Sequence, residues 1–292
     1  MSDPVSVEHQ ERGESETAGA AATLIGSRLR RAAVLLDHVA QTPPPLLEDS
    51  PALREEARRL RPLVEAVAGR RYGRLPHVAY RGRLEARLTG PWSQYLTLGI
   101  GLSRIVRMTP WETSRQAIPT ILAHELSHRF GFDESLTTLR GLEVSARLAE
   151  QGDPMHGVSS RLELARLLIG AAMGDALRTG ARQAIDRFFD AHANAPVMAR
   201  PRQQWARVKQ RQCPDWSLMV YAEMPCASIE TALELDRSRS SDLPFPYFPL
   251  DSFQAVACAI YTALDSLTGR RRQAVPLGAA LRLWRSADPG EA

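Results

Sequence analysis

His124 and His128 stand four residues apart in an apolar segment, as the ends of His-Glu-Leu-Ser-His. On an α-helix this spacing places both imidazoles on one face, about one turn apart, where two histidines can hold one metal ion. Ile118-Pro119 and Gly131 are the start and stop signals of a helix over residues 118–130. Because two histidines and a glutamate are costly to bury without a partner, we expect this helix to bind zinc.

Glu125, beside the first histidine, is not a ligand in sites of this kind. It takes a proton from the water that zinc activates and returns the proton to the leaving group. The sequence therefore predicts His124 and His128 as metal ligands and Glu125 as the general base.

The third metal ligand is less directly indicated. No further His or Cys follows soon after the motif, and Leu148 stands twenty residues on, where a thermolysin-like enzyme has its glutamate. Glu134 is the leading candidate, because it lies just past the Gly131-Phe132 step, where the chain can turn sharply toward the metal. An acidic residue there is also favoured by the helix dipole alone. The alternatives are Glu143, Asp133 and His156.

The composition predicts a globular protein. The chain has 292 residues, of which 44% are hydrophobic, and can therefore bury a sizeable core. Residues 1–20 are polar, acidic and poor in aromatics, so we expect a disordered tail there. Because no internal repeat is evident, we expect a single domain over residues 21–292.

The spacing of apolar residues predicts a mainly α protein with a small β-sheet, an α+β fold. Residues 21–70 are predicted to form an N-terminal helical hairpin, and residues 77–108, rich in Tyr, Ile, Val, Leu and Thr, to form two or three strands. Residues 118–292 are predicted to form a helical core that carries the metal site. The expected helices of this core span residues 118–130, 134–151, 158–178, 181–192, 199–212, 227–236, 250–268 and 275–285.

The net charge is +4, and nearly all of the positive charge is carried by arginine. Arginines alternate with glutamates, as in residues 53–62, which is typical of solvated helix faces. Arg270-Arg271-Arg272 is a compact basic run without aromatics, so we expect no nucleic-acid partner. The chain has neither a secretion signal nor an apolar stretch of about eighteen residues, so we expect a cytoplasmic protein with no membrane partner.

The stretch from Ile118 to about Leu168 resembles an uncharacterised bacterial family of zincin-like proteins, regarded as metallopeptidases of the gluzincin type. The upstream apolar strands and a late helix near Ser252 are also similar. The shared motifs are His-Glu-Leu-Ser-His, the Gly131-Phe132 step, Asp133-Glu134 at the start of the next helix, and Asp153-Pro154 with Ser159.

This resemblance implies a zincin-like fold with the metal site on a central helix. It also implies a full set of site residues. His124, His128 and Glu134 would be the ligands and Glu125 the base. The expected activity is that of a zinc metallopeptidase.

The resemblance further implies tyrosines near Val158 and Phe253, and this chain has none there. In this chemistry a tyrosine or histidine normally donates a hydrogen bond to the developing oxyanion. We therefore expect His156 or Tyr247 to take that role.

We expect a zinc-dependent metallohydrolase that cleaves a peptide or amide bond in a peptide or a small-molecule amide. One alternative is an enzyme in which the same ligands hold iron(II) and support oxygen-dependent modification of a peptide or natural product. Another is a non-catalytic binding module stabilised by metal. Residues 95–102 are a candidate edge strand for an extended peptide, and the Pro-rich residues 238–249 are a candidate lid.

Overall fold

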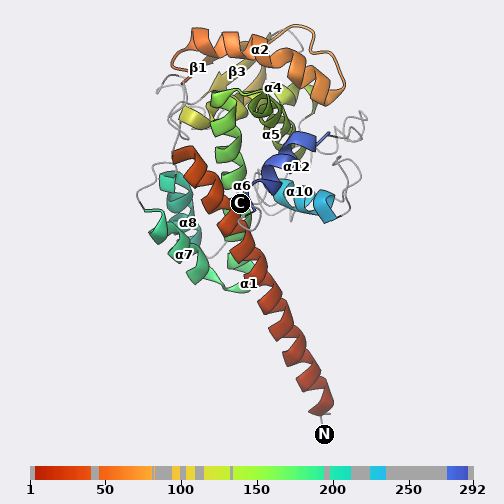
Figure 1. Cartoon of the computed structure of the whole chain (residues 1–292), viewed down its shortest axis with the longest axis vertical. Coiled ribbons are helices and arrows are strands. Elements are labelled where there is room, and N and C mark those ends of the chain that lie inside the picture. The colour runs from red at the N-terminus through yellow and green to blue at the C-terminus, as the bar shows by residue number, and fades with distance from the viewer. Residues whose placement is uncertain are drawn as a thin grey trace.

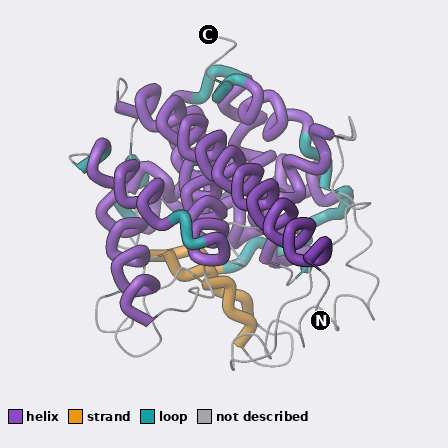
Figure 2. Tube along the Cα trace, turned by 90° about the horizontal axis from the view of Figure 1, so that it is seen from below, coloured by secondary structure: helices purple, strands orange, loops and turns teal. Residues whose placement is uncertain are grey.

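The protein is mainly helical, as the sequence predicts, with the strands gathered at one end of the helical body (Figures 1 and 2). No helix of the described ranges has the length and apolar content needed to cross a membrane. The computed structural model describes residues 4–40, 46–80, 82, 94–98, 103–108, 115–131, 134–193, 198–211, 224–234 and 275–288.

The helices of the predicted core begin and end within four residues of the expected positions. The one expected at residues 250–268 lies outside the described residues. The described helices are α1 (Pro4–Ala40), α2 (Ser50–Ala68), α4 (Ile118–Ser127), α5 (Glu134–Glu150), α6 (Pro154–Thr179), α7 (Arg182–Ala191), α8 (Ala199–Arg211), α10 (Met224–Glu234) and α12 (Gly278–Arg285), with 3-10 turns η1 (Arg115–Ala117) and η2 (His128–Phe130) on either side of α4.

Three short strands form a sheet beside α4. They are β1 (His77–Tyr80), β2 (Gln94–Leu98) and β3 (Ser103–Met108). Their order is β1-β3-β2, with β1 parallel and β2 antiparallel to β3. Among the described strands, β2 is therefore an edge, and it covers the first part of the predicted peptide-binding segment. That binding role stays a prediction.

α6 is the central helix of the molecule, because α1, α4, α5, α7, α8 and α10 all pack against it. Its start is fixed by Asp153, whose side chain accepts a hydrogen bond from the backbone N–H of His156, and by Pro154 in the first turn. Nearly every residue along its middle is buried. α6 thus links the elements around the histidines to the rest of the core, which is one continuous cluster of buried residues.

The N-terminal helices differ from the expected hairpin. α1 packs along α6, while α2 lies across the top of the molecule in Figure 1, against β1, α4 and α5. The apolar stripe of α1, which includes Ile25, Leu29 and Leu36, is buried. Because α6 offers that stripe a long buried face, α1 pairs with α6 instead of with its neighbour in sequence.

The first twenty residues also differ from expectation. Where the sequence predicts a disordered tail, α1 continues as a helix from Pro4 and extends beyond the body of the molecule (Figure 1). The predicted boundary at residue 21 falls close to Ile25, the first side chain of α1 described as buried.

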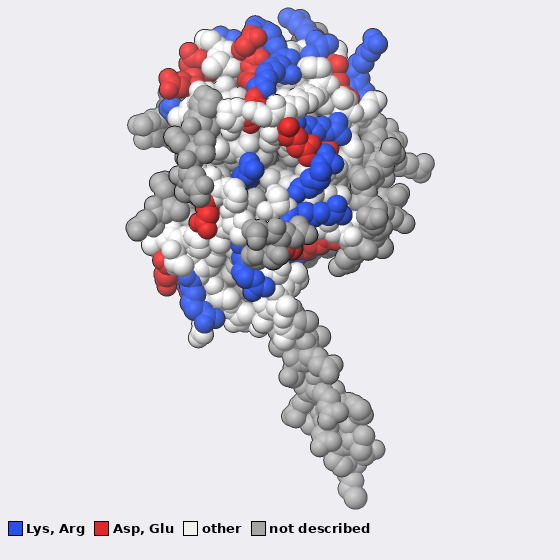
Figure 3. All heavy atoms as spheres, in the orientation of Figure 1, with Lys and Arg blue, Asp and Glu red and all other residues white. Residues whose placement is uncertain are grey.

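The charged surface is mixed in sign. On the face shown in Figure 3, acidic and basic side chains of the described residues lie beside each other. Arg282 on α12, for example, donates to both carboxylate oxygens of Glu150 on α5. This agrees with the expectation that most arginines belong to solvated helix faces.

Candidate metal centre

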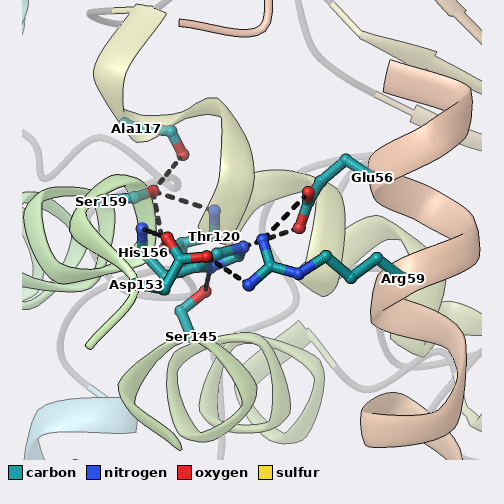
Figure 4. A network of polar contacts seen from close by, with 8 residues as sticks. All are labelled: Glu56, Arg59, Ala117, Thr120, Ser145, Asp153, His156 and Ser159. Atoms are coloured by element: carbon teal, nitrogen blue, oxygen red, sulfur yellow. Dashed lines mark hydrogen bonds and ion pairs between the residues drawn. The ribbon is translucent and has the colours of Figure 1, made fainter. Parts of the chain in front are cut away.

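The N-terminus of α4 is capped by a different helix. Ala117, the residue before α4, has no side chain that can cap it. Instead, the backbone N–H of Thr120 donates to Oγ of Ser159 on α6 at 2.9 Å. Ser159 Oγ also lies 2.8 Å from Thr120 Oγ1 and 3.1 Å from the carbonyl oxygen of Ala117 (Figure 4). This contact fixes the start of the histidine helix against the central helix.

The other end of α4 is held by Tyr72, in the segment after α2. Its hydroxyl donates to the carbonyl oxygen of Leu126 at 2.9 Å, and its ring packs edge-on against Phe130. Arg129 donates through Nε to the backbone carbonyl of Tyr72 at 3.4 Å. Both ends of the motif are therefore anchored to distant parts of the chain.

The two histidine rings converge. Nε2 of His124 lies 3.1 Å from Nε2 of His128, and the rings meet edge to face. The expected one-turn separation on a single face is therefore formed, although the second histidine lies in η2 just past the end of α4. His128 is buried and His124 is partly exposed.

The outer nitrogen of each ring has its own hydrogen-bond partner. Nδ1 of His124 lies 3.2 Å from Oγ1 of Thr138 on α5, and Nδ1 of His128 lies 3.3 Å from the carbonyl oxygen of Gly131. Metal-ligating histidines are commonly oriented in this way, through the nitrogen that does not face the metal. Both rings are thus held with their Nε2 atoms close to each other.

The separation of the two Nε2 atoms is close to that of two nitrogens on a tetrahedral metal ion. Two nitrogens that each bind zinc at the usual length, with a tetrahedral angle between them, are about 3.3 Å apart. The Nε2 atoms of His124 and His128 are separated by nearly this distance, at 3.1 Å. Imidazole nitrogens are also ligands that suit zinc or iron(II).

A carboxylate on α6 adds negative charge near the pair. Glu163 is buried and accepts hydrogen bonds from Nε and Nη2 of Arg166. Burial by itself raises the pKa of Glu163, but the charge and hydrogen bonds of Arg166, with a further contribution from His124, lower it overall. Glu163 is therefore ionised at neutral pH and is electrostatically coupled to the histidine helix.

The carboxylates predicted as the base and as the third ligand belong to different elements, and the structure does not describe all of them. Glu125 is buried on α4. Glu134 begins α5, but its side chain lies outside the described residues, as does all of Asp133. Within the described ranges no group of three or more His, Cys, Asp or Glu side chains is arranged to hold a metal ion. The described part of the centre is accordingly the histidine pair.

Glu143, an alternative third ligand, is engaged elsewhere. Its carboxylate accepts from Nε of Arg147 at 2.8 Å and from the backbone N–H of Ala280, in the first turn of α12, at 2.9 Å. Glu143 lies two positions after Gly141, which faces His124. Because a two-residue step turns a helical side chain by about 200°, Glu143 lies on the side of α5 away from His124. These contacts favour a structural role for Glu143, joining α5 to α12.

His156 is likewise part of a buried structural network (Figure 4). Its Nδ1 lies 3.0 Å from Oγ of Ser145 on α5, and its Nε2 lies 2.8 Å from a carboxylate oxygen of Glu56 on α2. Arg59 extends the network by pairing with both Glu56 and Asp153. His156 is fully buried, and both of its ring nitrogens have partners within the core. These contacts favour a structural role, in which His156 joins three helices, over a role in contact with a substrate.

Tyr247, the other oxyanion candidate, and the candidate lid at residues 238–249 lie outside the described residues.

Sequence reasoning missed Thr138, Gly141 and Glu163. Gly141 carried a signal, because an isolated glycine within a helix often marks a close contact. Thr138 carried another, as it follows Glu134 by one turn.

Comparison with protein-family models, with curated proteins and with solved structures gives no match for this chain.

Proposed function

We propose that this protein is a metal-dependent hydrolase, and more narrowly a zinc enzyme of zincin-like fold that cleaves a peptide or amide bond. The observation that supports it best is the convergence of the two Nε2 atoms at 3.1 Å, with each Nδ1 atom held by a separate partner. Two imidazoles that are oriented through their Nδ1 atoms and have their Nε2 atoms close together suit a shared metal ion.

Three residues would hold the metal. His124 and His128 supply their Nε2 atoms, and Glu134 supplies a carboxylate. The support for Glu134 comes from helix geometry, because position 134 precedes Thr138 by four residues and the two share one face of α5. Thr138 contacts His124, so that face of α5 is directed toward the histidines.

A set of two histidines and one carboxylate leaves a fourth coordination position open, which distinguishes catalytic from structural zinc sites. When bound, zinc polarises a carbonyl oxygen and lowers the pKa of water toward neutrality. Glu125 lies next to the first ligand in the chain and accepts the proton of the attacking water, then delivers it to the leaving nitrogen. The burial of Glu125 strengthens its electrostatic interactions.

The test is hydrolysis of a peptide library by zinc-loaded wild type, Glu125→Gln and Glu150→Gln. Glu125→Gln keeps the shape of the side chain but cannot take up a proton, so we expect zinc content to persist and turnover to fall by about 10²-fold or more. Glu150→Gln is the control, because Glu150 is an exposed residue paired with Arg282, and it should retain full turnover.

Full turnover by Glu125→Gln would contradict the assignment of the base. Turnover that depends on iron(II) and oxygen instead of zinc would favour the oxygen-dependent reaction. An intact cellular function in Glu125→Gln would favour a non-catalytic module.

A further inference from the structure

Glu163 lies level with the histidine helix inside the core. α5 and α6 are joined by a three-residue turn and pack against each other, so they run in opposite directions. Near the turn, Ser145 on α5 contacts His156 on α6. Two turns of a helix take about seven residues, so the same step away from the turn leads to Thr138 on α5 and Glu163 on α6. Thr138 contacts His124, which places Glu163 beside the same histidine.

A second contact gives the same placement from α4. Thr120 on α4 and Ser159 on α6 are hydrogen-bonded through both the backbone and the hydroxyl of Thr120. One turn further along each helix, on the same faces, stand His124 and Glu163. His124 also contributes to lowering the pKa of Glu163. The packing of α6 against α5 and against α4 therefore agrees with the electrostatic interaction between the two residues.

The ion pair of Glu163 and Arg166 is oriented with its negative end inside. Glu163 is buried, whereas the side chain of Arg166 is 36% exposed. Arg166 donates to one carboxylate oxygen through Nε at 2.8 Å and to the other through Nη2. Because water screens an exposed charge more than a buried one, the carboxylate dominates the electrostatic potential on the inner side of the pair.

A metal ion bound by the histidine pair needs a negative charge of this kind. Histidine binds a metal as a neutral ligand, so zinc held by two histidines and one carboxylate keeps one net positive charge. His128 is buried, and a charge without a counter-charge is costly in a buried position. A fixed carboxylate nearby offsets this cost and leaves the open coordination position free for water or substrate.

We propose that Glu163 belongs to the metal centre as a counter-charge, stabilising the bound ion from α6 without being one of its ligands. This rests on the metal centre of the proposed function. Among the described side chains, Glu163 does not form a metal-binding group with the two histidines, in agreement with a place outside the ligand set. Arg166 holds the carboxylate in position. The charge of Glu163 favours the occupied centre over the empty one and so raises zinc affinity.

The first experiment measures zinc affinity by competition with a chromophoric chelator, for wild type, Glu163→Gln and Glu143→Gln. Glutamine keeps the shape of glutamate and still accepts from an arginine, but it carries no charge. Glu143 is the matched control, because it is also buried and paired with an arginine of its own helix, on the side of α5 away from His124.

We expect Glu163→Gln to lose about 10-fold or more in zinc affinity, in the range seen for residues just outside a ligand set. Glu143→Gln should bind as tightly as wild type. Equal losses in the two variants would overturn the proposal, because they would report only the removal of a buried ion pair. Glu163→Asp keeps both the charge and the partner and should bind nearly as tightly as wild type. A loss in Glu163→Asp as large as that expected for Glu163→Gln would also overturn it.

The second experiment separates a counter-charge from a change in the shape of the site. The visible absorption of Co²⁺ reports its coordination geometry. At saturating Co²⁺ we expect the same band positions and intensities for wild type and Glu163→Gln, despite the weaker binding of the variant. A changed spectrum would overturn the proposal, because Glu163 would then be a ligand or would set the positions of the ligands.

A failure of this inference is distinguishable from a failure of the proposed function through His128→Ala. If wild type binds no zinc, both fail together. If wild type binds zinc, His128→Ala does not, and Glu163→Gln binds as tightly as wild type, then the metal centre stands and the role of Glu163 is refuted.

Discussion

A β-carbon on Gly141 would lie 2.8 Å from the backbone nitrogen of His124 and 2.9 Å from its Cα. Real Cβ atoms do not approach backbone atoms this closely, so α5 and α4 can touch here only because position 141 is glycine. Since Thr138 precedes Gly141 on the same side of α5, this close approach also sets the distance between its hydroxyl and the His124 ring.

Gly141→Ala should therefore separate the two helices. We expect the free energy of unfolding to fall by about 1–3 kcal/mol, measured by urea denaturation, and zinc affinity to fall with it. Gly157→Ala is the control, because the nearest atom to its new methyl is a guanidinium nitrogen of Arg161 at 3.5 Å. That variant should gain up to about 1 kcal/mol from helix propensity. Equal stabilities for the two variants would contradict the close contact.

Ser159→Ala should weaken the start of α4. It removes the oxygen that accepts from the backbone N–H of Thr120, and a lost cap of this kind costs about 0.5–2 kcal/mol. Ser160→Ala is the matched control, since Ser160 is equally buried and bonds the carbonyl of Gly157 in its own helix. Thermal unfolding of both variants gives the comparison. A larger loss in Ser160→Ala would count against the cap.

Asp153 should make stability depend on pH. Burial by itself raises the pKa of Asp153, but the hydrogen bond from the backbone of His156 and the ion pair with Arg59 lower it overall. A carboxyl whose pKa is lower in the folded state stabilises the fold above its unfolded pKa, near 4. That contribution is lost as the pH falls through the folded value.

Asp153→Asn isolates this contribution, because asparagine still caps a helix but does not titrate. We expect the difference in unfolding free energy between wild type and Asp153→Asn to shrink between about pH 6 and about pH 3. Because Arg59 is 43% exposed, the ion pair itself should contribute less than about 1 kcal/mol. A difference that does not change with pH would contradict the lowered pKa of Asp153.

His156→Phe distinguishes the structural role of His156 from a catalytic one. The variant leaves Glu56 and Ser145 without the ring nitrogens they contact, so we expect a loss of about 1–3 kcal/mol in unfolding free energy. Zinc content should be unchanged. A fall in turnover with no loss of stability would instead support the predicted oxyanion role.

The sequence predicted the local parts of this site well. The apolar spacing, Pro119 and Gly131 located the histidine helix, whereas α6 begins at Pro154, four residues before the expected start at residue 158. These signals are local, because capping residues and helical spacing act within a few positions of the residues they organise. The convergence of His124 and His128 follows from the same rule.

The long-range parts could not be read in this way. Ser159 caps a helix 39 residues earlier in the chain, and nothing in the spacing of apolar residues specifies that pairing. The N-terminal hairpin was expected because α1 and α2 are adjacent in sequence, yet α6 offers α1 the longer buried face. Glu143 was a plausible ligand by residue type, and only its contact with α12 indicates another use.

The central claim is that His124 and His128 hold a zinc ion together with Glu134. The most direct test is the metal content, by mass spectrometry, of wild type, His128→Ala and Glu134→Ala purified without added metal. We predict stoichiometric zinc in the wild type and its loss in both variants. Wild-type protein that is folded but carries no metal, or that carries iron in place of zinc, would contradict the account.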